Sequence, residues 1–172
     1  MRVSRQLSRL EPMVLKPLRG LTGDDWHRAP SGKWTIAQIV HHLAIGVDGT
    51  AEVWTRRAEA EGMKRRASPH QTVLRHLALG IGAFPPGLES PKGALPDERP
   101  DPEMVQAQFR MGVERYHELA ESWPAARQEA VFVNHPILGD LNFAEWVRFH
   151  YVHCRHHARQ IKSRLGWLKR ET

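Results

Sequence analysis

Residues 143–164 have the sequence FAEWVRFHYVHCRHHARQIKSR, and its periodicity decides the fold. Seven positions in this stretch step alternately by four and three residues, and they are Phe143, Val147, His150, Cys154, His157, Ile161 and Arg164. This spacing is typical of the inward face of a helix packed in a bundle. Asn142 and Glu145 have the spacing of a capping box. We therefore predict a helix that begins there and continues to Leu165, with Gly166 as its C-terminal stop.

Three histidines stand on or beside the inward face of this predicted helix. His150 and His157 replace aliphatic residues on that face, and His153 lies beside them. His153 and His157 are one turn apart, about 40° around the helix and about 6 Å along it, so both imidazoles can reach one ion about 2.1 Å from each nitrogen. The HExxH zincins use this spacing, although their glutamate is absent here. Two ligands alone do not hold a zinc-type ion, so a third must come from elsewhere. The alternative to a metal site is that these are buried histidines hydrogen-bonded to other polar groups.

A second predicted helix offers a third ligand. Thr35 and Gln38 form a capping pattern at its start, and it is expected to run to about Glu61 and stop at Gly62. His41 and His42 both lie off the centre of its main apolar stripe. That stripe consists of Ile36, Val40, Leu43, Val47, Ala51 and Trp54. His42 shares a smaller stripe with Ile39, Gly46, Gly49 and Val53, whose glycines would let another helix approach, and this favours His42 without excluding His41.

The remaining segments complete an all-α four-helix bundle. A first helix is predicted over residues 4–18, with a kink or break at Pro12, and another from Asp101 and Pro102 to Trp123. A short helix is expected over 71–79. The proline- and glycine-rich residues 82–102 predict a long ordered loop, and residues 128–141 form either a short hairpin or an extended connector. We expect a single domain over residues 1–172 with one long crossover loop.

The composition is that of a globular domain. Hydrophobic residues make up 41% of the 172 residues and charged residues 26%. No apolar run approaches the roughly 18 residues of a membrane span, and the N-terminus lacks an apolar signal core, so a cytoplasmic bacterial-type protein is expected. The single cysteine, Cys154, excludes an internal disulfide and a multi-cysteine metal site. The net charge of +6 makes nucleic-acid binding a possibility to consider. The clusters of basic residues are equally explained as solvated helix ends, so we do not expect a nucleic-acid partner.

Three motifs resemble a known family. They are WTIAQIVHHLA at residues 34–44, HCRHHARQI at 153–161 and NHPILGDLNFAEW at 134–146. Together they are similar to the DinB/YfiT-like superfamily of metal-binding four-helix proteins, in an uncharacterised branch. The resemblance implies that His42, His153 and His157 are the ligands of a zinc or nickel ion. Such a site leaves coordination positions open for water or substrate.

Residues near these three histidines are candidates for supporting roles at the site. Gln160 either orients a ligand imidazole or bound water through a hydrogen bond or is a partly exposed helix glutamine. His156 either assists it or lies on the surface. His135 and His150 are candidate contacts to a small-molecule substrate. The acids nearest to His42 along its helix, Asp48 and Glu52, would act as general bases only if the helix turned them inward.

Some members of the superfamily are transferases or isomerases that use a low-molecular-weight thiol such as bacillithiol, mycothiol or glutathione. The resemblance therefore implies a metal-dependent enzyme acting on a small molecule, either a thiol-dependent S-transferase or a hydrolase. A non-catalytic metal-binding stress-response module is the alternative, and both are favoured over a nucleic-acid binder. Homodimerisation is expected because it is common in the superfamily.

Overall fold

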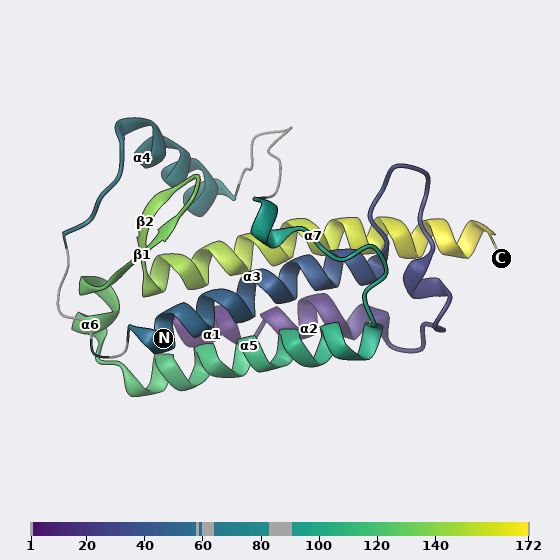
Figure 1. The fold of residues 1–172 in the computed structure, drawn as a ribbon, viewed down its shortest axis with the longest axis horizontal. Helices are drawn as coiled ribbons and strands as arrows, with labels where there is room; N and C mark the ends of the chain where they lie inside the picture. The colour runs from purple at the N-terminus through teal and green to yellow at the C-terminus, as the bar shows by residue number, and fades with distance from the viewer. Residues whose placement is uncertain (1, 58, 60–63, 83–90, 172) are drawn as a thin grey trace.

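A four-helix bundle forms the body of the protein, in agreement with the predicted all-α fold. The computed structural model describes residues 2–57, 59, 64–82 and 91–171. Figure 1 shows the long helices running side by side, with a short helix and a β-hairpin gathered at one end. The four helical units of the bundle are α1 with α2 (Arg2–Leu7 and Leu10–Leu15), α3 (Ile36–Arg56), α5 (Pro102–Ser122) and α7 (Phe143–Glu171).

The first unit is broken one turn earlier than predicted. The expected break at Pro12 lies instead at Ser8 and Arg9, between α1 and α2. Proline has no N–H to donate to the carbonyl four residues before it, and its ring clashes with that carbonyl, which here belongs to Ser8. This first helical unit then ends in a 3₁₀ turn, η1 (Lys16–Leu18), and Gly20 beyond it has a positive φ of 84°.

The helix α3 begins as predicted and ends earlier. Thr35 accepts from the Gln38 N–H at 3.2 Å while the Gln38 side chain accepts from the Thr35 N–H at 3.0 Å, so the capping box is present. The last helical residue is Arg56 rather than Glu61, and the predicted stop at Gly62 lies outside the described residues.

The helix α5 approaches α3 closely at a glycine of α5, and not at the glycines of α3. A Cβ added at Gly112 would lie 2.7 Å from the Asp48 Cα, so the two backbones meet there. Nothing lies within 4 Å of a Cβ built at Gly46 or Gly49, so the close helix approach predicted at these glycines is wrong. The start of α5 follows the prediction, with Asp101 accepting from the Glu103 and Met104 N–H groups at 2.9 Å.

A long crossover joins α3 to α5 as predicted, and part of it is helical. Residues 83–90 of the predicted ordered loop lie outside the described residues. The helix α4 of this crossover (Pro69–His76) starts at a Ser68–Gln71 capping box and continues into a π-helical turn, η3 (Leu77–Ile81). This matches the short helix expected over 71–79. A 3₁₀ turn, η4 (Lys92–Ala94), also lies in this crossover, and another, η2 (Asp25–His27), lies in the connection before α3.

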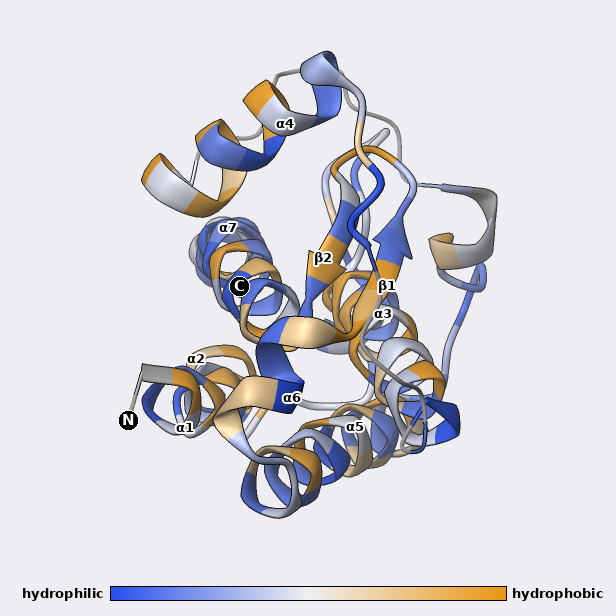
Figure 2. Cartoon of the chain, turned by 90° about the vertical axis from the view of Figure 1, so that its left-hand side faces the viewer, coloured by the Kyte–Doolittle hydropathy of each residue, from blue (hydrophilic) through white to orange (hydrophobic). Residues whose placement is uncertain are grey.

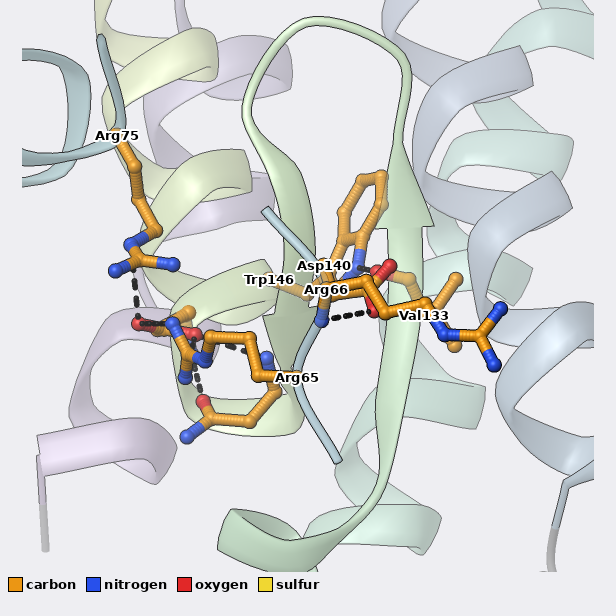
Figure 3. Close-up of polar contacts among 8 residues, drawn as sticks. Arg65, Arg66, Arg75, Val133, Asp140 and Trp146 are labelled. Atoms are coloured by element: carbon orange, nitrogen blue, oxygen red, sulfur yellow. Dashed lines mark hydrogen bonds and ion pairs between the residues drawn. The ribbon is translucent and has the colours of Figure 1, made fainter. Parts of the chain in front are cut away.

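The segment in which a short hairpin was predicted, residues 128–141, does contain one. Its strands β1 (Phe132–His135) and β2 (Gly139–Asn142) pair antiparallel, and a short helix, α6 (Ala125–Ala130), precedes them. The Trp146 indole of α7 donates to the Val133 carbonyl at 3.0 Å, which ties the hairpin to the bundle. Figure 3 shows this contact together with residues 65 and 66, which lie against the hairpin.

The last helix runs past the predicted stop at Gly166 and ends at Glu171. A glycine inside a helix costs about 1 kcal/mol relative to alanine. Burial beyond it offsets this cost, because Leu168 is buried and Trp167 packs against the core under the Arg28 guanidinium. The Asn142–Glu145 capping box at its start is present, with both bonds at 2.9 Å.

Apolar side chains fill the space between the four helical units. Figure 2, a view along the bundle, shows apolar segments turned toward neighbouring helices and hydrophilic ones turned out. At the hairpin end Trp54 packs edge-to-face on Trp123 and Phe143, with ring centroids 5.7 and 5.4 Å apart. No helix in the described part of the chain is long and apolar enough to cross a membrane.

Candidate metal centre

Three histidines from two packed helices of the bundle lie together. His42 lies in the second turn of α3, and His153 and His157 lie one turn apart on α7. His42 is 4% exposed and His157 7% exposed, while His153 is partly buried. The three offer ligand nitrogens that all lie within 4.8 Å of one another.

The ring nitrogens converge at distances that suit a shared ion. His42 Nε2 lies 3.1 Å from His153 Nε2, and His157 Nε2 lies 3.0 Å from the same atom. Two nitrogens bound about 2.1 Å from one metal are about 3.0 Å apart at a right angle and about 3.4 Å apart at the tetrahedral angle. The observed separations therefore fall at the short end of the range that coordination requires.

The hydrogen bonds around the rings fix where their lone pairs point. A carbonyl oxygen only accepts, so His42 Nδ1 donates to Ala94 O at 2.7 Å. His157 Nδ1 donates in the same way to Gln160 Oε1 at 2.8 Å. In a neutral imidazole the other nitrogen then carries a lone pair, and both Nε2 lone pairs face His153. One N–H on His153 Nε2 satisfies only one of them, whereas a cation satisfies all three nitrogens.

Burial keeps these rings neutral. It lowers the pKa of His157 to about 3 and the pKa of His153 well below its ordinary value, and in both the neighbouring histidines add to the effect. Burial also lowers the pKa of His42. Metal ions bind the neutral form of imidazole, so no proton needs to be removed near pH 7.

Trp34 and the end of the crossover form two walls of this cluster. The Trp34 ring lies 5.1 Å from the His42 ring and 6.4 Å from the His157 ring, between centroids. The sequence analysis did not predict this contact of Trp34 with the site. Ala94, on the other side, acts through its backbone carbonyl, which has no sequence signature.

His41, the alternative third ligand, faces elsewhere. Its Nδ1 accepts from the Asp97 N–H at 3.1 Å, so it anchors the crossover to α3. Gln38 adds to this anchor by donating to the carbonyls of Asp97 and Glu98. The structure thus brings His42, and not His41, to the histidines of α7.

Gln160 and His156 continue the hydrogen-bond chain outward from His157. Gln160 accepts from His157 through Oε1, and its Nε2 lies 3.3 Å from His156 Nε2. His156 is partly exposed, so the chain ends near the surface. This is the position from which Gln160 was predicted to orient the ligand ring.

His150 lies in a separate buried polar cluster. Its Nε2 is 2.8 Å from Thr50 Oγ1 and 3.1 Å from the Tyr116 hydroxyl, and the Tyr116 hydroxyl also donates to Thr50 at 3.0 Å. His150 is 1% exposed, and burial lowers its pKa to about 3. Neither Thr50 nor Tyr116 was expected as its partner from the sequence.

His135 sits at the end of the first hairpin strand. Its Nδ1 accepts from the N–H groups of Ile137 and Leu138 at 3.1 and 3.2 Å, which holds the turn. Its ring packs on Phe149, whose own ring stacks on His153 at 5.2 Å. The predicted substrate contacts of His135 and His150 therefore stay predictions, with His135 joined to the site through Phe149.

Neither candidate general base faces the histidines. Asp48 accepts from Arg115 at 2.6 Å and from Gln108 at 3.4 Å, both on α5. Glu52 pairs with Arg56 on α3 itself. A general base at the site, if the chemistry needs one, is therefore neither of these acids.

The chain belongs to the DinB superfamily, whose family model matches residues 6–161. It also matches the crystal structure of TT2238, a four-helix bundle protein, with a TM-score of 0.55 and 24% sequence identity. That match covers 94% of this chain and 96% of the other, and it shows the shared fold alone. No curated protein matches the chain.

Proposed function

We propose that this DinB-superfamily protein binds a divalent metal ion through His42, His153 and His157 and acts on a small molecule there. One observation carries the proposal: three Nε2 atoms converge, and the Nδ1 atoms of His42 and His157 donate elsewhere, which leaves their Nε2 lone pairs free for an ion. Catalytic zinc sites usually have three protein ligands, with three histidines as one such set, and keep a position open. Imidazole ligands suit zinc and nickel alike.

The reaction class follows from the chemistry of such a centre. A divalent ion held here lowers the pKa of a bound water or thiol and so supplies a nucleophile near neutral pH. The chain itself holds the rings in place, through the Ala94 carbonyl for His42 and through Gln160 for His157. The Trp34 ring packs against one side of the cluster. We therefore propose S-transfer from a low-molecular-weight thiol, or hydrolysis, as the reaction.

Metal analysis of purified protein tests the binding step. We expect about one zinc or nickel ion per chain in the wild type and loss of that ion in both His42→Ala and His153→Ala. His70→Ala removes an exposed imidazole from α4 and serves as the matched control, with metal content unchanged. Circular dichroism checks that each variant folds. A wild-type protein that carries no divalent metal, and takes none up when zinc or nickel is supplied, would overturn the proposal.

A metal-binding stress-response module without turnover is the second candidate. It is favoured by the engagement of Asp48 and Glu52 away from the histidines, which leaves neither as a base. Cobalt-substituted protein separates the two functions. A sulfur-to-cobalt absorption band on adding glutathione, with conjugation of electrophiles, supports the transferase. Metal binding without thiol-dependent conjugation or hydrolysis across a substrate panel supports the module.

A further inference from the structure

A polar cleft lies far from the three histidines, where α3 ends beside the hairpin. Its volume is about 420 Å³, within the range of small-molecule sites. Arg57 stands fifteen residues after His42, a separation of about 22 Å along a helix. The cleft is lined by Arg57, Lys64, Arg66, Phe132, Asn134 and Asp140.

Three cations line this cleft against one carboxylate. Asp140 is 9% exposed, and both of its oxygens are engaged, Oδ2 by the Arg66 N–H at 2.8 Å and Oδ1 by the Asn134 amide at 3.1 Å. The carboxylate is held by two neutral donors and keeps its charge, so it offsets one of the three cations. Lys64 and Arg66 are exposed, and no acid pairs with either side chain in the part of the chain that the structure describes. The cleft carries a net positive charge.

The cationic groups are carried by a fixed frame. Asp140 N donates to the Arg66 carbonyl at 3.0 Å, so this segment is tied to the hairpin in both directions. The Arg57 side chain is fixed to the first strand of the hairpin, because its Nη1 donates to the Phe132 carbonyl at 3.0 Å. Figure 3 shows the Arg66 backbone beside Asp140, with its side chain extending across the hairpin. A frame held in this way lowers the entropy lost when a ligand binds.

We propose that this cleft binds a small phosphate monoester. Two exposed cations and a partly buried arginine match a dianionic phosphate group, which guanidinium and ammonium groups recognise through charge-assisted hydrogen bonds. The Asn134 amide nitrogen donates to Asp140, and its side-chain oxygen is an acceptor that a ligand hydroxyl group could use. Phe132 supplies an apolar wall. A concave site of this size favours a small molecule over the backbone of a nucleic acid, which needs an extended basic surface.

An NMR titration tests the proposal with inorganic phosphate, glucose 6-phosphate and uncharged glucose at near-physiological salt. The protein is used both as purified and after chelator treatment, so that any binding to the metal centre is recognised. We expect saturable shifts of amides near residues 64–66 and 132–140 with both phosphates, the same in both preparations, and none with glucose.

Two double variants with equal net charge complete the experiment. Lys64→Ala/Arg66→Ala removes the exposed cations of the cleft and keeps the backbone bonds to Asp140, and we expect it to weaken phosphate binding by about tenfold or more. Lys162→Ala/Lys169→Ala removes two exposed cations of α7 and leaves binding unchanged. Equal weakening in the two variants, or no saturable shift in the wild type, overturns the proposal. Binding of an oligonucleotide without binding of either phosphate overturns it as well.

Discussion

The Gln160 side chain, which accepts a hydrogen bond from His157, is expected to affect how tightly the site binds metal. Gln160→Ala leaves the His157 Nδ1–H without its acceptor, and partners of this kind are worth about 10- to 100-fold in metal affinity. We therefore expect weaker zinc binding in competition with a chromophoric chelator. Gln160→Glu keeps an acceptor at the same place and should bind at least as tightly as the wild type. Equal affinity in the wild type and Gln160→Ala would contradict this role.

Single residues also mark the limit of sequence reasoning at the site. The spacing of His153 and His157 predicts their shared face because helical geometry is local. The choice between His41 and His42 depends on what each ring meets across the bundle, and periodicity alone left it open. The acceptor on His42 is the backbone carbonyl of Ala94, a group that every residue carries, so no pattern in the sequence identifies it.

At the scale of elements, the crossing of α3 and α5 depends on Gly112. An added methyl group there would lie 2.7 Å from backbone atoms of Asp48, which cannot move without shifting the helix. We expect Gly112→Ala to lower the free energy of unfolding by about 1–3 kcal/mol, measured in urea. Gly49→Ala is the matched control, because it adds the same atoms to open space and should be neutral or stabilising. Similar losses in the two variants would show that the crossing is not tight at Gly112.

The length of α7 leads to the opposite expectation at Gly166. This residue lies inside the helix, and the nearest atom to an added Cβ is the end of the Arg170 side chain, at 3.8 Å. Gly166→Ala should raise the free energy of unfolding by up to about 1 kcal/mol through helix propensity. Urea unfolding measures the change. A loss of stability would indicate that the helix ends at Gly166 in solution, as the sequence predicts.

Element ends were predicted well where a local signal decides them and poorly where packing does. The capping boxes at Thr35 and Asn142 are local, and both helices begin as predicted. The end of α7 depends instead on burial of Leu168, a tertiary contact that outweighs the glycine. The hairpin is a similar case, because its strands are short and gain their stability from contacts such as the Trp146 bond to Val133.

For the whole molecule, we propose that the chain forms a homodimer through α4 and its π-helical extension. Val73, Leu77 and Ile81 stand four residues apart and are 58%, 43% and 70% exposed. Such a stripe of apolar side chains is more typical of an interface than of free surface. Light scattering after size exclusion should give twice the chain mass, and Val73→Ser/Ile81→Ser should give the monomer. A monomeric wild type at high concentration would rule this pairing out.

Buried neutral histidines make the whole fold sensitive to acid. Burial lowers the pKa of His135 from 6.5 to about 4, so below pH 6.5 the unfolded chain takes up a proton that the folded chain excludes. Stability is therefore full above pH 6.5 and falls as the pH approaches 4. For His135 alone the loss between pH 7.5 and pH 5 is about 2 kcal/mol. Urea unfolding of chelator-treated protein at several pH values measures it.

The variant His135→Asn isolates this contribution from that of the acidic side chains. Asparagine does not titrate, and its side-chain oxygen can still accept from the Ile137 N–H, as His135 Nδ1 does. The variant should be less stable than the wild type at pH 7.5, because the ring contacts with Trp146 and Phe149 are lost. Its stability should then fall less steeply toward pH 5, by about 2 kcal/mol less than the wild type. Parallel pH profiles for the two proteins would show that His135 takes up a proton in the folded state as readily as in the unfolded one.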